Sequence, residues 1–143
     1  MKQLFKLAAA AALGAFASGT IVYAQAASSD PPKARIAIYR AAPGQQVALL
    51  RYLAAQDRIA QSVGIAPSKL YAHTDGDSWD YLAIDPVTTD AQDDAIDAAA
   101  KKMGLTAGPA ASIEFRKYVS VHTDTFAIGP VTVSQYLAMA GQQ

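Results

Sequence analysis

The chain contains no cysteine in its 143 residues. Disulfide bonds and cysteine-ligated zinc are therefore excluded, and so is a lipoprotein anchor, which needs a cysteine after the apolar leader. The chain also has no excess of positive or negative charge, because 12 basic residues balance 12 acidic ones. A chain without excess positive charge has no electrostatic basis for binding nucleic acid.

Long hydrophobic runs are confined to the N-terminus. Lys2 and Lys6 precede an apolar run from Leu7, and the small residues of Ala24–Ala26 follow it. A charged start, an apolar centre and a small-residue end are typical of a secretory signal peptide. We expect residues 1–26 to be removed by cleavage after Ala26. Cleavage after Ala17 and an uncleaved membrane anchor are the alternatives.

The mature chain is expected to be a single small domain. Loss of the two leader lysines leaves ten basic against twelve acidic residues, a formal charge of −2. Residues 27–33 are predicted to form a polar linker. Residues 34–143 are predicted to form one α+β domain, which is large enough for one modest core. We expect the protein to be exported to the periplasm or the medium, with no membrane contact after cleavage.

Strand-like and helical segments alternate along this domain. Alternating apolar residues predict a strand over 34–41, and strong helix formers predict a helix over 45–63. Residues 68–87 hold two strand-like runs around the turn at 75–78, which is typical of a β-hairpin.

The second half of the chain is marked by a helix start signal. Thr89 stands three residues before Gln92 as a capping box, and Gly104 provides a C-terminal cap. Residues 110–116 fit either a short helix or a strand, and residues 117–128 are rich in strand formers. Residues 132–140 have the length of a final helical turn or two.

This order of elements predicts a ferredoxin-like βαββαβ protein. We expect a four-stranded antiparallel sheet in the order 4-1-3-2, with helices on one face and a short C-terminal extension. From Arg35 to about Ile128 the chain resembles the dimeric α/β-barrel superfamily, on this order, on the APG of Ala42–Gly44 and on the hairpin DGDSWDYLAI of Asp75–Ile84.

The resemblance implies a homodimer whose sheets pack face to face. The superfamily includes cofactor-free monooxygenases, haem-degrading enzymes and many uncharacterised proteins. The Asn, Trp and His set of the haem-degrading branch has no counterpart here, so the resemblance supplies no catalytic residue. No cofactor is expected.

Both histidines of the chain stand in the same local context, YAHTD at 71–75 and SVHTD at 120–124. In the predicted topology they lie on opposite edge strands, near opposite ends, so one subunit cannot bring both to a shared metal ion. We therefore expect no metal site within one chain; a site across a dimer interface stays open. An Asp two residues later can orient each imidazole, as His73 with Asp75 and His122 with Asp124.

The period of two along the strands separates two sets of side chains. The aliphatic set is expected to face the helices: Ile36, Ile38, Leu70, Ala72, Leu82, Ile84, Val119 and Val121. The other set is expected on the uncovered face: Tyr39, Tyr71, His73, Trp79, Tyr81, Tyr118, Ser120 and His122. An uncovered aromatic face indicates a binding surface, either for a second copy of the sheet or for a small ligand.

The function predicted from these features is the binding of a small apolar or aromatic molecule by a homodimer. The candidate ligand-binding residues are Tyr39, Tyr71, His73, Trp79, Tyr81 and His122. The alternative is a cofactor-free monooxygenase or isomerase acting on a small aromatic substrate, in which a histidine serves as general acid or base. The sequence assigns no catalytic residue, and the aromatic face is equally explained as dimer core alone.

Overall fold

The computed structural model describes residues 32–76 and 78–141. The elements are β1 (Lys33–Ala41), α1 (Gln46–Ser62), β2 (Lys69–Ala72), β3 (Tyr81–Pro86), α2 (Asp90–Lys102), α3 (Pro109–Phe115), β4 (Val119–Ile128) and α4 (Val133–Met139). The predicted leader and its cleavage site after Ala26 lie outside the described residues, as does most of the predicted linker.

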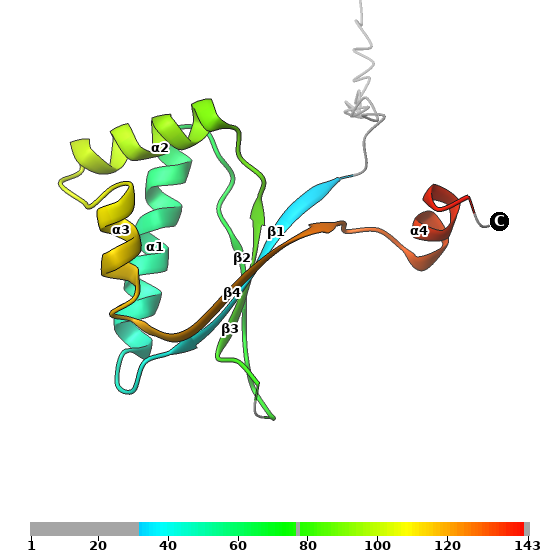
Figure 1. Ribbon diagram of the computed structural model, residues 1–143, viewed down its shortest axis with the longest axis horizontal. Coiled ribbons are helices and arrows are strands. Elements are labelled where there is room, and N and C mark those ends of the chain that lie inside the picture. The colour runs from blue at the N-terminus through cyan, green and yellow to red at the C-terminus, as the bar shows by residue number, and fades with distance from the viewer. Residues whose placement is uncertain (1–31, 77, 142–143) are drawn as a thin grey trace, which may run out of the picture.

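The four strands form one antiparallel sheet in the order β2-β3-β1-β4, as predicted. Long β1 and β4 pair over nearly their whole lengths, and β3 pairs with β1 from Tyr39 opposite Tyr81 to Ala34 opposite Pro86. The helices α1, α2 and α3 lie together on one face of this sheet (Figure 1). The α+β class and the strand order are thereby confirmed, and the arrangement is consistent with the ferredoxin-like one.

Local sequence signals determine where the helices begin. The predicted capping box is formed at α2, where the Thr89 hydroxyl accepts from Gln92 N and the Gln92 side chain accepts from Thr89 N. The ambiguous segment after α2 is the helix α3. Gly108 precedes it with φ 56°, a left-handed conformation that glycine adopts without strain, and Pro109 occupies its first turn.

The assignment of the two sheet faces from sequence is wrong. The buried core joins Ala37, Tyr39 and Ala41 of β1 to Ala83 of β3 and to Leu49 of α1. The helices therefore cover the face that carries Tyr39, whose side chain is 5% exposed. The physical reason is volume: alanines on β1 and β3 let the helices approach the sheet closely, and one large ring fills the remaining space.

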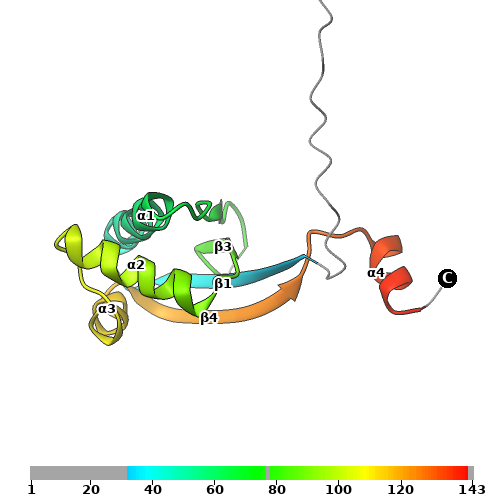
Figure 2. The same ribbon diagram turned by 90° about the horizontal axis from the view of Figure 1, so that it is seen from above.

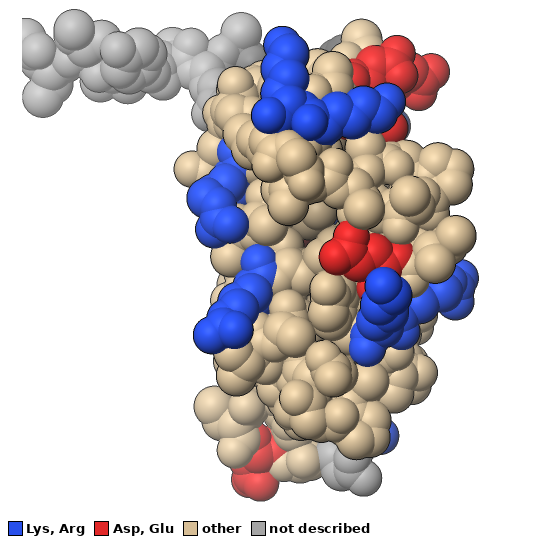
Figure 3. Space-filling model, turned by 90° about the vertical axis from the view of Figure 1, so that its left-hand side faces the viewer, with Lys and Arg blue, Asp and Glu red and all other residues tan. Residues whose placement is uncertain are grey.

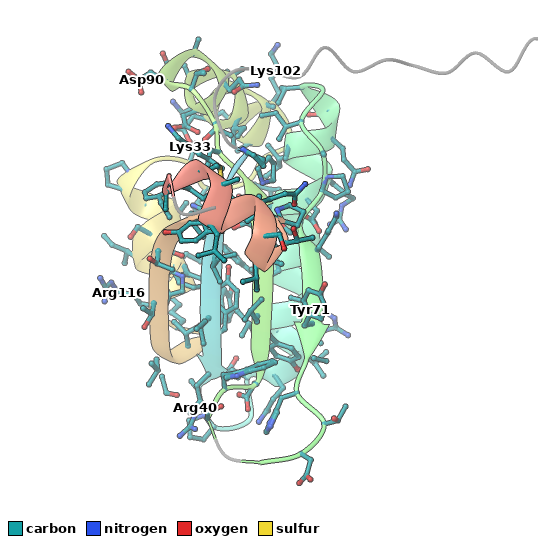
Figure 4. All side chains as sticks on the ribbon, turned by 90° about the vertical axis from the view of Figure 1, so that its right-hand side faces the viewer. Lys33, Arg40, Tyr71, Asp90, Lys102 and Arg116 are labelled. Atoms are coloured by element: carbon teal, nitrogen blue, oxygen red, sulfur yellow. The ribbon has the colours of Figure 1, made fainter. Side chains whose placement is uncertain are left out.

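The uncovered face is aliphatic instead of aromatic. Ile36 and Ile38 of β1 lie opposite Ile84 and Leu82 of β3 on this side, and Val121 of β4 lies opposite Arg40. Figure 4 looks onto this face, with the strands in front of the helices.

The second strand is the exception, because the faces of its residues agree with the prediction. Tyr71 pairs with Leu82, and Ala72 pairs with Tyr81, so Tyr71 belongs to the uncovered face, whereas Leu70 and Ala72 belong to the helix side. A register shift between Arg40 and Ala41 in the pairing with β4 turns Val119 toward the core.

The last helix stands apart from the rest of the fold. After β4 the chain leads to α4, which lies on the side of the sheet opposite α1, α2 and α3 (Figures 1 and 2). Its apolar side chains are exposed, with Val133 at 79% and Tyr136 at 55%. None of the helices in the described part of the chain combines the length and apolar character needed to cross a bilayer.

Candidate functional site

The candidate site is a cavity of about 460 Å³ between the sheet and the helix α1. Its floor is formed by β1, β3 and β4, through Tyr39, Ala83 and His122. One wall is the inner side of α1, where Tyr52 and Leu53 lie one turn apart from Gln56 and Asp57. A cavity of this size, mostly apolar with a few polar groups, suits one small organic molecule.

Aromatic rings from four elements surround the cavity. Phe115, at the end of α3, packs edge-on against Tyr39, with the ring centroids 6.0 Å apart, and lies 5.6 Å from the Tyr52 ring. Two hydrogen bonds hold α3 in this place: Tyr52 Oη donates to Ala111 O at 3.3 Å, and Gly108 N donates to Asp97 Oδ1 at 3.2 Å. We call Tyr39, Tyr52, Phe115 and His122 the aromatic cluster.

His122 lies on an edge strand and contacts two rings of this cluster. Its imidazole stacks on Tyr39, with centroids 5.0 Å apart and planes 17° apart, and meets Phe115 edge-on at 4.8 Å. Its Nε2 lies 3.1 Å from Asp124 Oδ1. The side chain of His122 is 28% exposed. In the described part of the chain, Nδ1 has no hydrogen-bond partner, so it is the nitrogen left for a ligand.

An ion pair forms the polar end of the cavity. Arg35 Nε and Nη2 donate to Asp85 Oδ2 at 3.0 and 2.8 Å. Asp85 Oδ1 is buried and accepts no hydrogen bond in the described structure. Burial works to lower the pKa of Arg35, but the hydrogen bond and charge of Asp85, together with Asp124, raise it above its ordinary value.

The pKa of Tyr39 reflects the burial and the negative charges around the cavity. Burial first, and then the negative charges of Asp85, Asp124 and Asp57, raise the pKa of the Tyr39 phenol well above 10.0, whereas Arg35 acts in the opposite direction. The phenol is therefore neutral at any physiological pH, and three carboxylates from different elements act on it.

Two of the six predicted site residues line this cavity, Tyr39 and His122. Tyr81 lies nearby, packed against the core. Tyr71 is exposed on β2, at the edge of the uncovered face (Figure 4).

His73 and Trp79 contact one another in the connection between β2 and β3, with centroids 5.2 Å apart and planes tilted by 46°. The His73 imidazole hydrogen-bonds the backbone oxygen of Asp75 and not its carboxylate, which accepts from Gly76 N.

Several cavity residues were missed from sequence, among them Arg35, Tyr52, Asp57 and Phe115. Tyr52 and Asp57 carry a detectable signal, because they fall on the inner side of a predicted amphipathic helix. Phe115 carries none, since its segment fitted either a helix or a strand. Arg35 was not singled out from sequence, and only the register with Asp85 places it beside the cavity.

Metal binding and an extended basic surface find no support in the described residues. Within residues 32–76 and 78–141, no three His, Asp or Glu side chains are grouped to hold a metal ion. The helix side in Figure 3 shows Lys and Arg side chains spread out, with uncharged surface between them.

The fold and the cavity define a small α+β protein with an open antiparallel sheet and a site between sheet and helices. No family model matches the chain, and no curated protein matches it. A search of solved structures finds PA3566 from Pseudomonas aeruginosa, at 18% identity and a TM-score of 0.47, covering 73% of this chain and 99% of that one.

Proposed function

We propose that this protein binds a small, ring-containing molecule in the cavity between the sheet and α1. The observation that carries the proposal is the aromatic cluster around His122, where the imidazole is stacked on one ring and met edge-on by another. Such walls bind a planar ring through burial and stacking, each ring contact contributing about 0.5–1.5 kcal/mol beyond the buried area. The cavity volume of about 460 Å³ fits one such molecule.

Filling the cavity tests this proposal. Ala54 lines the cavity and its side chain is exposed on α1, so Ala54→Phe places a ring in the opening without disturbing the core. Calorimetry with 2-phenylethanol should show binding to the wild type and a loss of at least about tenfold in affinity for Ala54→Phe.

Ala98→Phe is the matched control, because Ala98 is exposed on α2 and lines neither cavity of the described structure. It should bind 2-phenylethanol as the wild type does. A wild type that binds no ring compound, or equal binding by Ala54→Phe, would rule the proposal out.

The second candidate function is cofactor-free catalysis on the bound ring compound. It rests on the His122–Asp124 pair, in which Nε2 lies 3.1 Å from a carboxylate oxygen that can orient the imidazole, so that Nδ1 is left to take a proton from a substrate. The two functions differ in whether the bound molecule is converted. In an enzyme, His122→Gln abolishes turnover, since the amide cannot accept and return a proton, whereas in a binding protein it only weakens ring binding through the loss of one ring of the aromatic cluster.

We further propose that the protein is a homodimer of the dimeric α/β-barrel type, with the uncovered aliphatic face buried against a second copy. The strands span nine, four, six and ten residues. A strand residue covers about 3.3 by 4.8 Å, so this face provides roughly 450 Å². A standard interface buries about 800 Å² per partner. The exposed apolar side chains of α4, on the same side of the sheet, supply further area.

A further inference from the structure

The cavity of the aromatic cluster continues into a second one of about 410 Å³. The two share Arg35, Gln56, Asp57 and Ser68 in their linings, so they adjoin along β1 and α1. We call the pair of cavities the cleft. The second cavity is more polar, and it reaches Asp85 on β3 and Asp93 on α2.

Charge in the cleft is strongly one-sided. One guanidinium, that of Arg35, faces four carboxylates, from Asp57, Asp85, Asp93 and Asp124. The Arg35 charge is already engaged by Asp85 at 2.8 Å. The lining of the cleft thus has a formal charge of −3 when His122 is neutral, in a protein whose complete chain is balanced.

A second observation is that one carboxylate oxygen of the cleft has no hydrogen-bond donor in the described structure. The Asp85 side chain is 7% exposed, and its Oδ1 accepts no hydrogen bond from any described residue. A buried carboxylate oxygen without a donor is costly, because the low dielectric interior strengthens every uncompensated charge. After burial, the charge of Asp85 also helps to raise the pKa of the Tyr39 phenol, which lines the cleft.

From the aromatic cluster and these carboxylates we infer that the natural ligand is a positively charged amine that carries a ring. The ring occupies the cavity between Tyr39, Tyr52 and Phe115, and the ammonium group lies toward Asp57 and Asp124. Ring faces also attract cations, so the aromatic walls and the carboxylates favour the same charge. Anionic ring compounds are repelled by the cleft. This inference rests on the proposed ring-binding function and adds the charge of the ligand to it.

Three probes of equal ring and similar length test the inference: 2-phenylethylamine, 2-phenylethanol and phenylacetate, which carry positive, zero and negative charge. Calorimetry at neutral pH should rank them in that order, with the amine at least about tenfold tighter than the alcohol. The affinity ratio of amine to alcohol should fall several-fold in Asp57→Asn and in Asp124→Asn. Both amides retain the acceptor oxygen, for Ser68 N and for His122, respectively.

Asp94→Asn is the matched control, because Asp94 is exposed on α2 and lines neither cavity. Its amine-to-alcohol ratio should equal that of the wild type. Alcohol binding equal to or tighter than amine binding, or an unchanged ratio in both cleft variants, overturns the inference while ring binding stands. Absence of binding by all three probes removes the ring-binding function itself.

Discussion

Tyr39 connects the packing of the fold to the chemistry of the cavity. Its ring is part of the buried core, it stacks on His122, and it lines the cavity. A buried phenol is stable only in its neutral form, and the carboxylates around it strengthen that preference. The same residue therefore has a role in stability that depends on pH and a role in ring binding that does not.

The pH dependence gives a prediction for Tyr39→Phe. Because the pKa of Tyr39 is raised in the folded state above its ordinary value of 10.0, its contribution to stability is complete below pH 10 and is lost as pH rises further. The unfolding free energy of Tyr39→Phe, minus that of the wild type, should be constant at lower pH and then increase by up to about 1.4 kcal/mol per pH unit. Urea unfolding across this range measures the difference, and a flat difference through pH 11 would show that Tyr39 ionises freely.

The sheet is central to the organisation of the molecule, because each of its faces carries a group of apolar side chains. One face holds small residues and Tyr39 under the helices, and the other holds Ile38, Leu82 and Val121 without a helix over them. Sheets with one solvated face usually alternate apolar with polar residues. An aliphatic second face is therefore the main structural support for a partner subunit.

Substitution on this face tests the homodimer. Val121 of β4 is 52% exposed, so Val121→Asp should leave the subunit folded and place a charge in the dimer interface. Light scattering should show a wild-type dimer and a folded monomer for Val121→Asp, with ring binding retained. Val47→Asp is the control, since Val47 is 60% exposed at the start of α1 on the helix side. A wild type that is monomeric at micromolar concentration would contradict the homodimer.

Apart from α3, whose segment fitted either a helix or a strand, the order and type of the elements could be predicted from sequence, because capping boxes, turn glycines and strand alternation are local signals. The identity of the covered face could not. In β1, Ala37 and Tyr39 alternate with Ile36 and Ile38, and both sets are apolar, so the period of two groups the residues without saying which group the helices cover. That choice depends on how closely a helix can approach, which favours the alanines.

The two identical His-Thr-Asp stretches show the same limit at the candidate site. His122 lies within β4, where its register opposite Tyr39 brings its ring into the aromatic cluster. His73 lies after the end of β2 in a connection, where it contacts Trp79 instead. Equal motifs therefore have different surroundings, because the partners of a side chain come from elements that are distant in sequence.

In the molecule as a whole, the two sides of one sheet have different proposed roles. The helix side encloses the cleft, and the open side, with α4 beside it, is offered to a second copy (Figures 1 and 4). The proposed ligand site and the proposed dimer interface are thus spatially separate. A change on the open side is expected to alter assembly without changing the lining of the cleft.

The central claim is that a ring compound binds on the helix side of the sheet, and nuclear Overhauser contacts to a bound probe test it most directly. With 2-phenylethylamine at saturation, the account predicts contacts from the probe ring to the ring protons of Tyr39, Tyr52 and Phe115. Contacts to Ile38 and Tyr71 on the open side would contradict the claim, as would a saturated complex with no contact to the aromatic cluster.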